Sequence, residues 1–456
     1  MGEGTYVKPT IEMPEDWQSP SERRSPPPAP PRAEPAAPTG GIWGTEVPPL
    51  SPARAQVRGR AGVDWLLVGV VAGLVLFGLV MVYSSSVKFS AEIEQPVYYF
   101  LLRQSLWAGL GALVATLLAF INYHYIRVFG VWIMLGTLVL LLAVATFGDT
   151  TYGAIRSLAE GSIRPSELAK LVTILYVSVW LNAKRDVLNE ISLGLIPLMA
   201  ILGLTGGLIL VQPDLSAALT VLILGCLLFF LSGGEWRQIA LVLLVAVVLG
   251  WGIVNVYPTG VDRITRYLAG LNNPLEASYH VQRALEAVIN GGLFGVGIGH
   301  GSTKFTGLPV ALTDSIFAVI TEELGLLGAG VMISAYLIIL WRGLSIARRA
   351  EDHLGALIAG GITIWIALEA LINMAVMVNL LPHAGNALPF ISYGGTHLLV
   401  TLAGVGILIN IARTSGRSEK TGGTRGGGNP FGAVIDLRWR DRGRRVSRPG
   451  RSAGTR

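Results

Sequence analysis

The sequence predicts an all-α polytopic membrane protein, and its composition and the clustering of its apolar residues lead to that class. Of the 456 residues, 52% are hydrophobic and only 14% are charged, with a mean hydropathy of +0.56. A soluble protein carries about a quarter charged residues. The apolar residues are also gathered into runs near or above the ~20 residues that a helix needs to cross a bilayer. We therefore expect about ten transmembrane helices.

The predicted spans are apolar runs separated by polar or proline-containing segments. They cover residues 63–84, 102–121, 128–147, 167–182, 191–210, 215–232, 238–257, 315–341, 355–380 and 390–412. The only cysteine, Cys226, lies in the sixth run, so no intramolecular disulfide can form.

Two tails flank the predicted transmembrane domain, which covers residues 63–413. Residues 1–62 are rich in Pro, Ala, Glu and Arg, and residues 414–456 are rich in Gly and Arg. Such segments cannot bury enough apolar surface to fold. We expect both tails to be disordered.

The short loops predict the orientation in the plasma membrane. Lys184 and Arg185 follow span four, and Arg348 and Arg349 follow span eight. Cytoplasmic loops carry an excess of Lys and Arg, so these loops and both termini are expected on the cytoplasmic side. The large loop 258–314, between spans seven and eight, is then extracytoplasmic.

Ionisable side chains in the spans mark candidate sites, because each costs a few kcal/mol in hydrocarbon unless it faces a cavity or a partner. Arg164, Glu167 and Lys170 in R-P-S-E-L-A-K share one helix face at the start of span four. They form either an interfacial ion pair or a cationic site for an anionic ligand. Asp214 in Q-P-D-L-S is either a cap of span six or a functional residue.

Spans eight and ten carry further polar signals. Thr313 and Asp314 are expected to cap span eight, and the adjacent Glu322 and Glu323 indicate a cavity within it. The segment L-P-F-I-S-Y-G-G, which contains Ser392, interrupts the entry to span ten. Broken backbone at membrane depth must be satisfied by protein or water, so this segment is expected to form a cavity wall.

The glycines between residues 291 and 301 match a dinucleotide loop only superficially. No strand precedes them, so nucleotide binding is rejected and tight packing of the loop is preferred. No nucleic-acid partner is expected.

Taken together, these segments resemble one family. Y-S-S-S at the end of span one and Arg103-Gln104 at the start of span two occur in the order found in the SEDS proteins. The same order continues with R-P-S-E-L-A-K, Q-P-D-L-S, L-T-D-S-I-F-A-V-I-T-E-E-L-G and L-P-F-I-S-Y-G-G. The chain resembles this FtsW/RodA/SpoVE family over residues 63–412, as a divergent member. The resemblance implies a peptidoglycan glycosyltransferase that polymerises lipid II on the outer membrane face. It also implies a class B penicillin-binding protein as partner. The role could be in division, elongation or sporulation, and the long tails slightly favour a division protein.

The resemblance also suggests substrate-binding residues. A lipid pyrophosphate needs cationic contacts, which Arg164 and Lys170 can supply. The full candidate set is Arg164, Glu167, Lys170, Asp214, Asp314, Glu322, Glu323 and Ser392. No metal ligand is assigned, and a divalent cation at the pyrophosphate is left open.

The general base is the point at which the sequence departs from the family pattern. The resemblance implies an aspartate before proline in D-P-x-x-x-x-Y, but this chain reads N-P-L-E-A-S-Y, which places Asn273 there. A carboxamide cannot accept the proton. Glu276 would share a helix face with Asn273 and could act as the catalytic base instead. Two alternatives stay open: a non-catalytic scaffold that binds lipid II or a penicillin-binding protein, and a flippase for lipid-linked precursors.

Overall fold

The computed structural model describes residues 62–147, 149–151, 154–157, 164–256 and 258–421, all within one compact unit, Gly59–Arg456. Residues 1–61 and 422–456, which contain most of the predicted tails, lie outside the described residues. The last helix continues to Thr421, past the predicted end of the transmembrane domain at residue 413.

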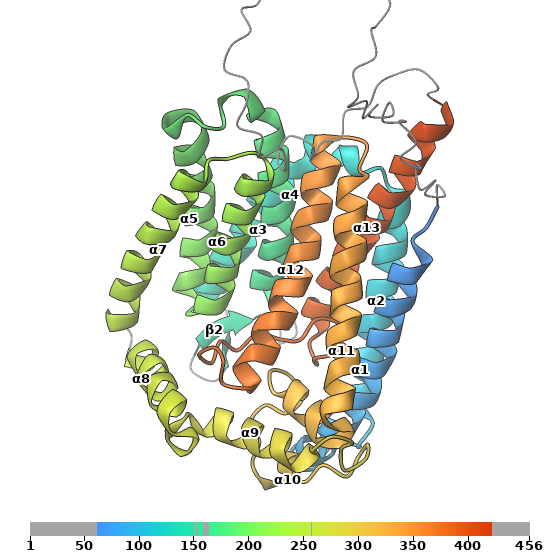
Figure 1. The fold of residues 1–456 in the computed structure, drawn as a ribbon, viewed down its shortest axis with the longest axis vertical. Coiled ribbons are helices and arrows are strands. Elements are labelled where there is room, and N and C mark those ends of the chain that lie inside the picture. The colour runs from blue at the N-terminus through green and yellow to red at the C-terminus, as the bar shows by residue number, and fades with distance from the viewer. Residues whose placement is uncertain (1–61, 148, 152–153, 158–163, 257, 422–456) are drawn as a thin grey trace, which may run out of the picture. The chain divides into compact units, whose positions relative to one another are not determined.

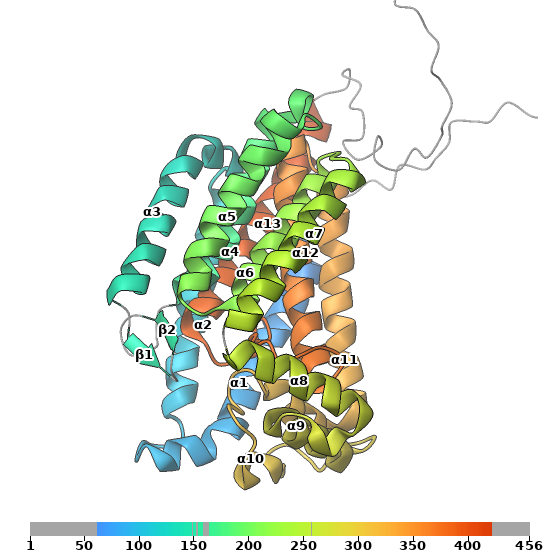
Figure 2. The same ribbon diagram turned by 90° about the vertical axis from the view of Figure 1, so that its left-hand side faces the viewer.

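Each of the ten predicted spans falls on a helix (Figures 1 and 2). The helices are α1 (Trp65–Glu92), α2 (Tyr99–Phe120), α3 (Ile126–Phe147), α4 (Pro165–Ala183), α5 (Ile196–Val211), α6 (Leu215–Leu231), α7 (Trp236–Val256), α11 (Ile316–Arg348), α12 (His353–Met377) and α13 (Gly395–Thr421). Within the described residues, seven helices are long and apolar enough to cross a membrane. The helices α6 and α7 are shorter apolar helices, and α4 carries buried charges, so the number ten itself stays a prediction.

The 258–314 segment is mostly helical rather than an extended loop. It contains α8 (Pro258–Asn272), η5 (Pro274–Glu276), α9 (Tyr279–Gly291) and α10 (Thr303–Thr306). The other short elements are η2 (Tyr123–Tyr125), η3 (Arg185–Val187), η4 (Ile191–Leu195) and the antiparallel pair β1 (Asp149–Thr151) and β2 (Ala154–Ser157). Figure 1 shows α8, α9 and α10 together at one end of the long helices, which we call the α9 end.

The first helix is fixed at the opposite end by an ion pair. Asp64 accepts a hydrogen bond from the backbone N–H of Leu67 (3.2 Å), as an N-cap residue does. The same carboxylate pairs with the guanidinium of Arg342 on α11 (2.6 Å). This pair joins α1 to α11, and the two helices lie side by side (Figure 1).

The core is formed by α4, α12 and α13, whose side chains are largely buried. Trp365 of α12 is completely buried between them. Close packing of α13 on α2 depends on Gly406, because a Cβ there would lie 2.4 Å from the carbonyl oxygen of Ala115. Hence α2 and α13 form a tightly joined pair, and the site lies where their ends meet.

Candidate functional site

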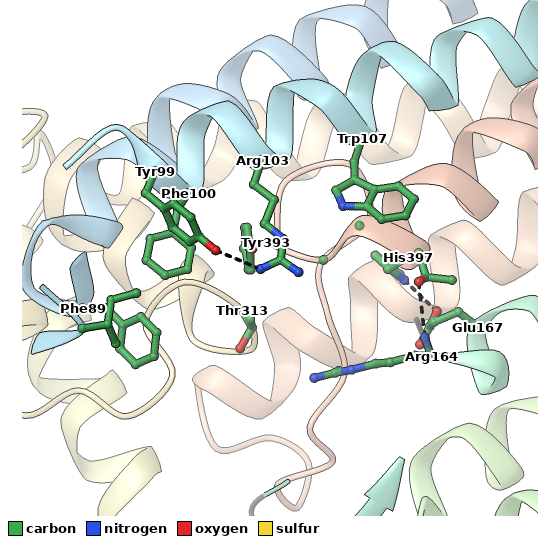
Figure 3. Close-up of a pocket in the computed structure, with 14 residues that line it drawn as sticks. Phe89, Tyr99, Phe100, Arg103, Trp107, Arg164, Glu167, Thr313, Tyr393 and His397 are labelled. Atoms are coloured by element: carbon green, nitrogen blue, oxygen red, sulfur yellow. Dashed lines mark hydrogen bonds and ion pairs between the residues drawn. The ribbon is translucent and has the colours of Figure 1, made fainter. Parts of the chain in front are cut away.

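A cavity of about 310 Å³ opens at the α9 end (Figure 3). It is bounded by α1, α2, the start of α4, and the segment that leads into α13. Its lining residues are Phe89, Ile93, Tyr99, Phe100, Arg103, Trp107, Arg164, Glu167, Thr313, Tyr393, Gly394, Gly395, Thr396 and His397. Figure 3 shows aromatic side chains at one side, Phe89 and Phe100, and charged side chains, Arg164 and Glu167, at the other. Such a cavity suits a ligand with an apolar part and a charged part.

The cavity wall is held by contacts between α2 and the interrupted entry to α13. The amide of Gln104 donates to the carbonyl of Ser392 (3.2 Å) and accepts from the backbone N–H of Gly394 (3.3 Å). A Cβ on Gly395 would lie 2.3 Å from the ring of Trp107, so only glycine permits this approach. The sequence prediction that this segment forms a cavity wall is consistent with these contacts.

The side chain of Arg103 on α2 is oriented by a hydrogen bond to a residue of the same helix. Arg103 lies one turn after Tyr99 and donates a hydrogen bond to that hydroxyl (3.3 Å). Phe100 packs edge-on against Tyr393, with ring centroids 5.2 Å apart. The guanidinium is therefore held within an aromatic wall, where a planar donor group can bind an anion in a fixed orientation.

Buried charges lie beneath the cavity. The ammonium of Lys170 is 2.9 Å from Glu167 and also binds Glu369 of α12. The Nδ1 atom of His397 lies 2.7 Å from Oε2 of Glu167. Paired in this way, charges that would be costly alone are compensated within the protein.

The same cluster contains side chains of the kinds that bind metal ions. Ligand atoms of Glu167, Glu369 and His397 all lie within 4.8 Å of one another. Both carboxylates already bind the ammonium of Lys170, however. Lys170 takes the place that a cation would occupy, and we assign no metal to these residues.

Of the predicted binding residues, Arg164 and Glu167 line the cavity, and Lys170 is bonded beneath it. Asp214 caps α6 by accepting from the backbone N–H of Ala217 (3.1 Å), which favours the structural alternative for this residue. Ser392 is buried, and its hydroxyl donates to the carbonyl of Thr313 (2.7 Å). Ser392 therefore does not line the cavity but supports its wall through this hydrogen bond.

Asp314 follows the lining residue Thr313. The helix α11 begins at Ile316, with Ser315 at the N-cap position, so the expected capping by Thr313 and Asp314 is wrong by one or two residues. One carboxylate oxygen of Asp314 would lie 3.5 Å from a Cβ on Gly385, so this side chain faces the segment between α12 and α13.

Glu322 and Glu323 do not line this cavity. Glu322 accepts hydrogen bonds from the backbone N–H groups of Ser302 (3.0 Å) and Thr303 (3.2 Å). Glu323 is paired with Lys304 at 2.5 Å and accepts a hydrogen bond from Ser84 of α1 (2.7 Å). Both carboxylates are fully buried. Their hydrogen bonds and the ion pair hold the α10 segment against α11, which favours a structural role over substrate binding.

Asn273 and Glu276 lie apart from the cavity. Asn273 caps η5 by accepting from Leu275 (3.1 Å), and its amide donates to Oε1 of Glu276 (3.0 Å). Glu276 is exposed. The two side chains are hydrogen-bonded, but Asn273 is extended before a 3-10 turn rather than on one α-helix face with Glu276, and neither residue contributes to the lining.

A second cavity, of about 120 Å³, lies between α8, α9 and the segment after α12. Its lining residues are Asp262, Arg263, Arg266, Tyr267, Ser278, His280, Val281, Asn379 and His383. Burial and the neighbouring His383 lower the pKa of His280 to about 4, against the opposing charge of Asp314. Burial and Arg263 lower the pKa of His383 to about 4 as well. Both rings are neutral near pH 7.

A family model described as "Cell cycle protein", for FtsW, RodA and SpoVE, matches residues 64–417. The chain belongs to this FtsW/RodA/SpoVE family. It is 37% identical over 360 residues to a probable peptidoglycan glycosyltransferase FtsW of Geobacter sp. (strain M18), covering 78% of this chain and 98% of that protein. It is 34% identical over 361 residues to stage V sporulation protein E of Bacillus subtilis (strain 168), with the same coverage.

Solved structures from the FtsW/RodA/SpoVE family share the fold. One belongs to a peptidoglycan synthase complex that coordinates polymerization and crosslinking; its TM-score is 0.63 at 27% identity, over 77% of this chain and 98% of that one. Another is the rod shape determining protein RodA of Thermus thermophilus, with a TM-score of 0.56 at 26% identity, over 77% and 97% of the chains. The family identified from the sequence motifs is confirmed.

In this member of the FtsW/RodA/SpoVE family, the sequence predicted no binding role for several polar or aromatic lining residues, among them Arg103, Trp107, Tyr393 and His397. His397 carried a usable signal, because it is an ionisable residue within a predicted span. Trp107 and Tyr393 carried none, since aromatic residues near span ends are equally typical of the membrane interface.

Proposed function

We propose that this protein is a peptidoglycan glycosyltransferase that polymerises lipid II on the outer face of the cytoplasmic membrane, in cell division or cell-shape maintenance. The relatives' names support the activity. The single observation that supports the site is the cavity at the α9 end, which combines an aromatic side with Arg103 and Arg164. A polyprenyl pyrophosphate has the same two parts.

The cavity residues have complementary roles in this proposal. The aromatic side receives the first part of the lipid chain, and the two arginines bind the pyrophosphate through charge-assisted hydrogen bonds. An acceptor hydroxyl attacks the anomeric carbon of the donor sugar, and the pyrophosphate leaves with the electrons of the broken C–O bond. Because negative charge grows on that pyrophosphate, fixed cations stabilise the transition state more than the ground state.

The reaction also needs a base for the acceptor proton, which typically contributes about 10²–10⁴ in rate. Glu276 stays one candidate, although it lies outside the cavity lining and is hydrogen-bonded to Asn273. Asp314 is the second candidate. It follows Thr313 of the first cavity, and its charge acts on His280 of the second cavity. Asp314 lines neither cavity, but it adjoins a lining residue of the first and acts electrostatically on a lining residue of the second, whereas Glu276 is exposed, so we favour Asp314 as the base.

The test is polymerisation of lipid II by purified protein, alone and with its class B penicillin-binding protein. We expect Asp314→Asn to lower the rate by at least about 10², because it keeps the shape and loses the base. Glu276→Gln should stay within a few-fold of the wild type.

A large loss of activity in Glu276→Gln, with Asp314→Asn near the wild-type rate, would identify Glu276 as the base. In that case Asn273→Asp should raise the activity of the protein. A wild type that binds lipid II but never polymerises it would support the scaffold alternative. Lipid movement across protein-containing vesicles without polymerisation would support the flippase alternative.

We also propose a partner and an orientation. One similar solved structure is a complex that coordinates polymerization and crosslinking. A class B penicillin-binding protein that crosslinks the new strands is the matching partner for this chain. The α9 end, with both cavities, then faces outward, and both termini are cytoplasmic.

A further inference from the structure

The helix α8 carries an exposed apolar side. Val261, Leu268 and Leu271 are 42%, 55% and 54% exposed, and Ile264 is partly exposed. Their spacing of i, i+3, i+7 and i+10 places all four residues on one side of the helix. We call these four residues the α8 stripe. Leu275, in the η5 turn that follows, adds a further exposed leucine next to the stripe.

A second side of α8 packs on the protein. Gly270 is buried, and its carbonyl accepts a hydrogen bond from the amide of Asn379 (3.1 Å). Tyr267, one turn earlier, donates a hydrogen bond from its hydroxyl to the carbonyl of Leu380 (2.9 Å). These contacts fix the rotation of α8 about its own axis, so the stripe cannot turn inward without breaking them.

A third side of α8 is charged. The guanidinium of Arg266 lies 2.7 Å from the carboxylate of Asp262, and both side chains are more than half exposed. An exposed ion pair of this kind is hydrated. The helix therefore has one side on protein, one side in water and one aliphatic side that is exposed. A charged side next to an apolar side is typical of a helix that lies in a membrane interface.

The position of α8 along the chain favours lipid as the cover of the stripe. It begins two residues after the end of α7, whose Leu244, Val247 and Val248 are 61%, 68% and 62% exposed. In a polytopic membrane protein, such an apolar surface contacts the bilayer. Both views show α8 turning away from the direction of α7 and running towards α9 (Figures 1 and 2). The stripe thus begins where the lipid-facing surface of α7 ends.

The composition of the stripe also favours lipid over a protein partner. All four of its side chains are aliphatic, so they offer a surface without directional contacts. The residues that dominate protein–protein binding are instead enriched in Trp, Tyr and Arg, and Leu and Val are under-represented among them. A bilayer needs only apolar area, which the stripe supplies.

We propose that α8 is an interfacial anchor whose stripe inserts about 5–10 Å into the boundary between lipid headgroups and acyl chains at the α9 end. Four residues of α8 also line the second cavity, namely Asp262, Arg263, Arg266 and Tyr267. The anchor therefore holds that cavity at the membrane surface, at the depth of lipid headgroups. This inference concerns the position of α8 in the bilayer and does not depend on the proposed activity.

Spin labelling tests the depth of the stripe. Full-length protein with Cys226→Ala and a nitroxide on Leu268→Cys is reconstituted into vesicles of phosphatidylethanolamine and phosphatidylglycerol. Electron paramagnetic resonance then measures collisions of the nitroxide with oxygen, which is concentrated in the acyl region, and with a water-soluble nickel chelate. We expect the ratio of oxygen to nickel accessibility to be severalfold higher for Leu268→Cys than for Arg266→Cys. Arg266→Cys is the matched control on the charged side of the same helix.

A second measurement asks whether the whole stripe is held by lipid. The nitroxide is moved to Leu271→Cys, and two glutamates are introduced into the stripe as Val261→Glu and Leu268→Glu. Because charged side chains disfavour insertion of the apolar side, the label should become severalfold more accessible to the nickel chelate. The conservative pair Val261→Ile and Leu268→Met should leave its accessibility unchanged.

The other outcomes overturn the anchor. Equal ratios at Leu268→Cys and Arg266→Cys, or a Leu271→Cys label that does not respond to the two glutamates, would show that lipid does not hold the stripe. Protection of Leu268→Cys from both reagents in these vesicles would show that a second copy of the chain covers it. Access to the nickel chelate that is lost only on adding a class B penicillin-binding protein would identify that protein as the occupant. Polymerisation of lipid II tests the proposed function separately in each case.

Discussion

Lys170 is the residue on which the buried charges depend. Its ammonium binds carboxylates from two helices, Glu167 on α4 and Glu369 on α12. Lys170 and Glu369 are buried, and the Glu167 side chain is 13% exposed where it lines the cavity. Removing one partner from a buried ion pair leaves an uncompensated charge, which costs about 3–5 kcal/mol. Lys170 therefore contributes to folding as well as to the charge of the cavity.

We accordingly expect Lys170→Ala to lower the free energy of unfolding by about 3–5 kcal/mol and to lower the unfolding temperature in detergent. Adding Glu369→Gln should recover part of this loss, because it removes one of the two orphaned carboxylates. Lys184→Ala, at an exposed position after α4, is the control and should have little effect. If Lys170→Ala unfolds at the wild-type temperature, the cluster stabilises nothing and its role is confined to the cavity.

Among the secondary-structure elements, the segment between α9 and α10 packs closely against a kink in α11. Gly325 has a φ of 68°, and a Cβ there would lie 2.4 Å from the backbone nitrogen of Gly295. The backbone N–H of Val296 donates to the carbonyl of Glu322 (3.0 Å), and that of Leu326 donates to Gly292 (2.9 Å). Glycine is required where chains approach so closely at positive φ.

Gly325→Ala should therefore release this segment. The strained backbone alone costs about 1–3 kcal/mol, so amide hydrogen exchange across residues 291–306 should accelerate by at least about fivefold. Gly330→Ala is a matched control on the same helix, since a Cβ there meets nothing within 4 Å. Equal exchange in both variants would show that the segment is held by other contacts.

The sequence indicates the helices better than it indicates their partners. Each of the ten predicted spans falls on a helix because hydropathy detects an apolar run whatever that run packs against. Lys304 was not found as the partner of Glu323, since it lies outside the spans and nothing in the local pattern links the two residues. The same limit applies to Glu369 and Lys170, which are 199 residues apart. Partners so distant in the sequence are determined by helix packing, which periodicity does not reveal.

The molecule as a whole has two chemically different ends. The two cavities and the helices α8, α9 and α10 lie at one end (Figure 1). At the other ends of α4 and α11 lie the basic residues Lys184, Arg185, Arg348 and Arg349. Since Lys and Arg are concentrated in cytoplasmic loops, the α9 end should face outward, where a lipid-linked sugar would be polymerised.

Cysteine labelling in intact cells tests this orientation. In a Cys226→Ala background, Asn290→Cys at the exposed end of α9 should react with a membrane-impermeant thiol reagent. Lys184→Cys should react only after the membrane is permeabilised, because the positive charges hold that loop on the cytoplasmic side. Removal of Cys226 is tolerable for this purpose, since its thiol is buried within α6 and forms no disulfide. Labelling of Lys184→Cys in intact cells, with Asn290→Cys protected, would show that the orientation is the reverse of the one predicted. Both cavities would then lie on the cytoplasmic side, where polymerisation of an exported substrate could not occur.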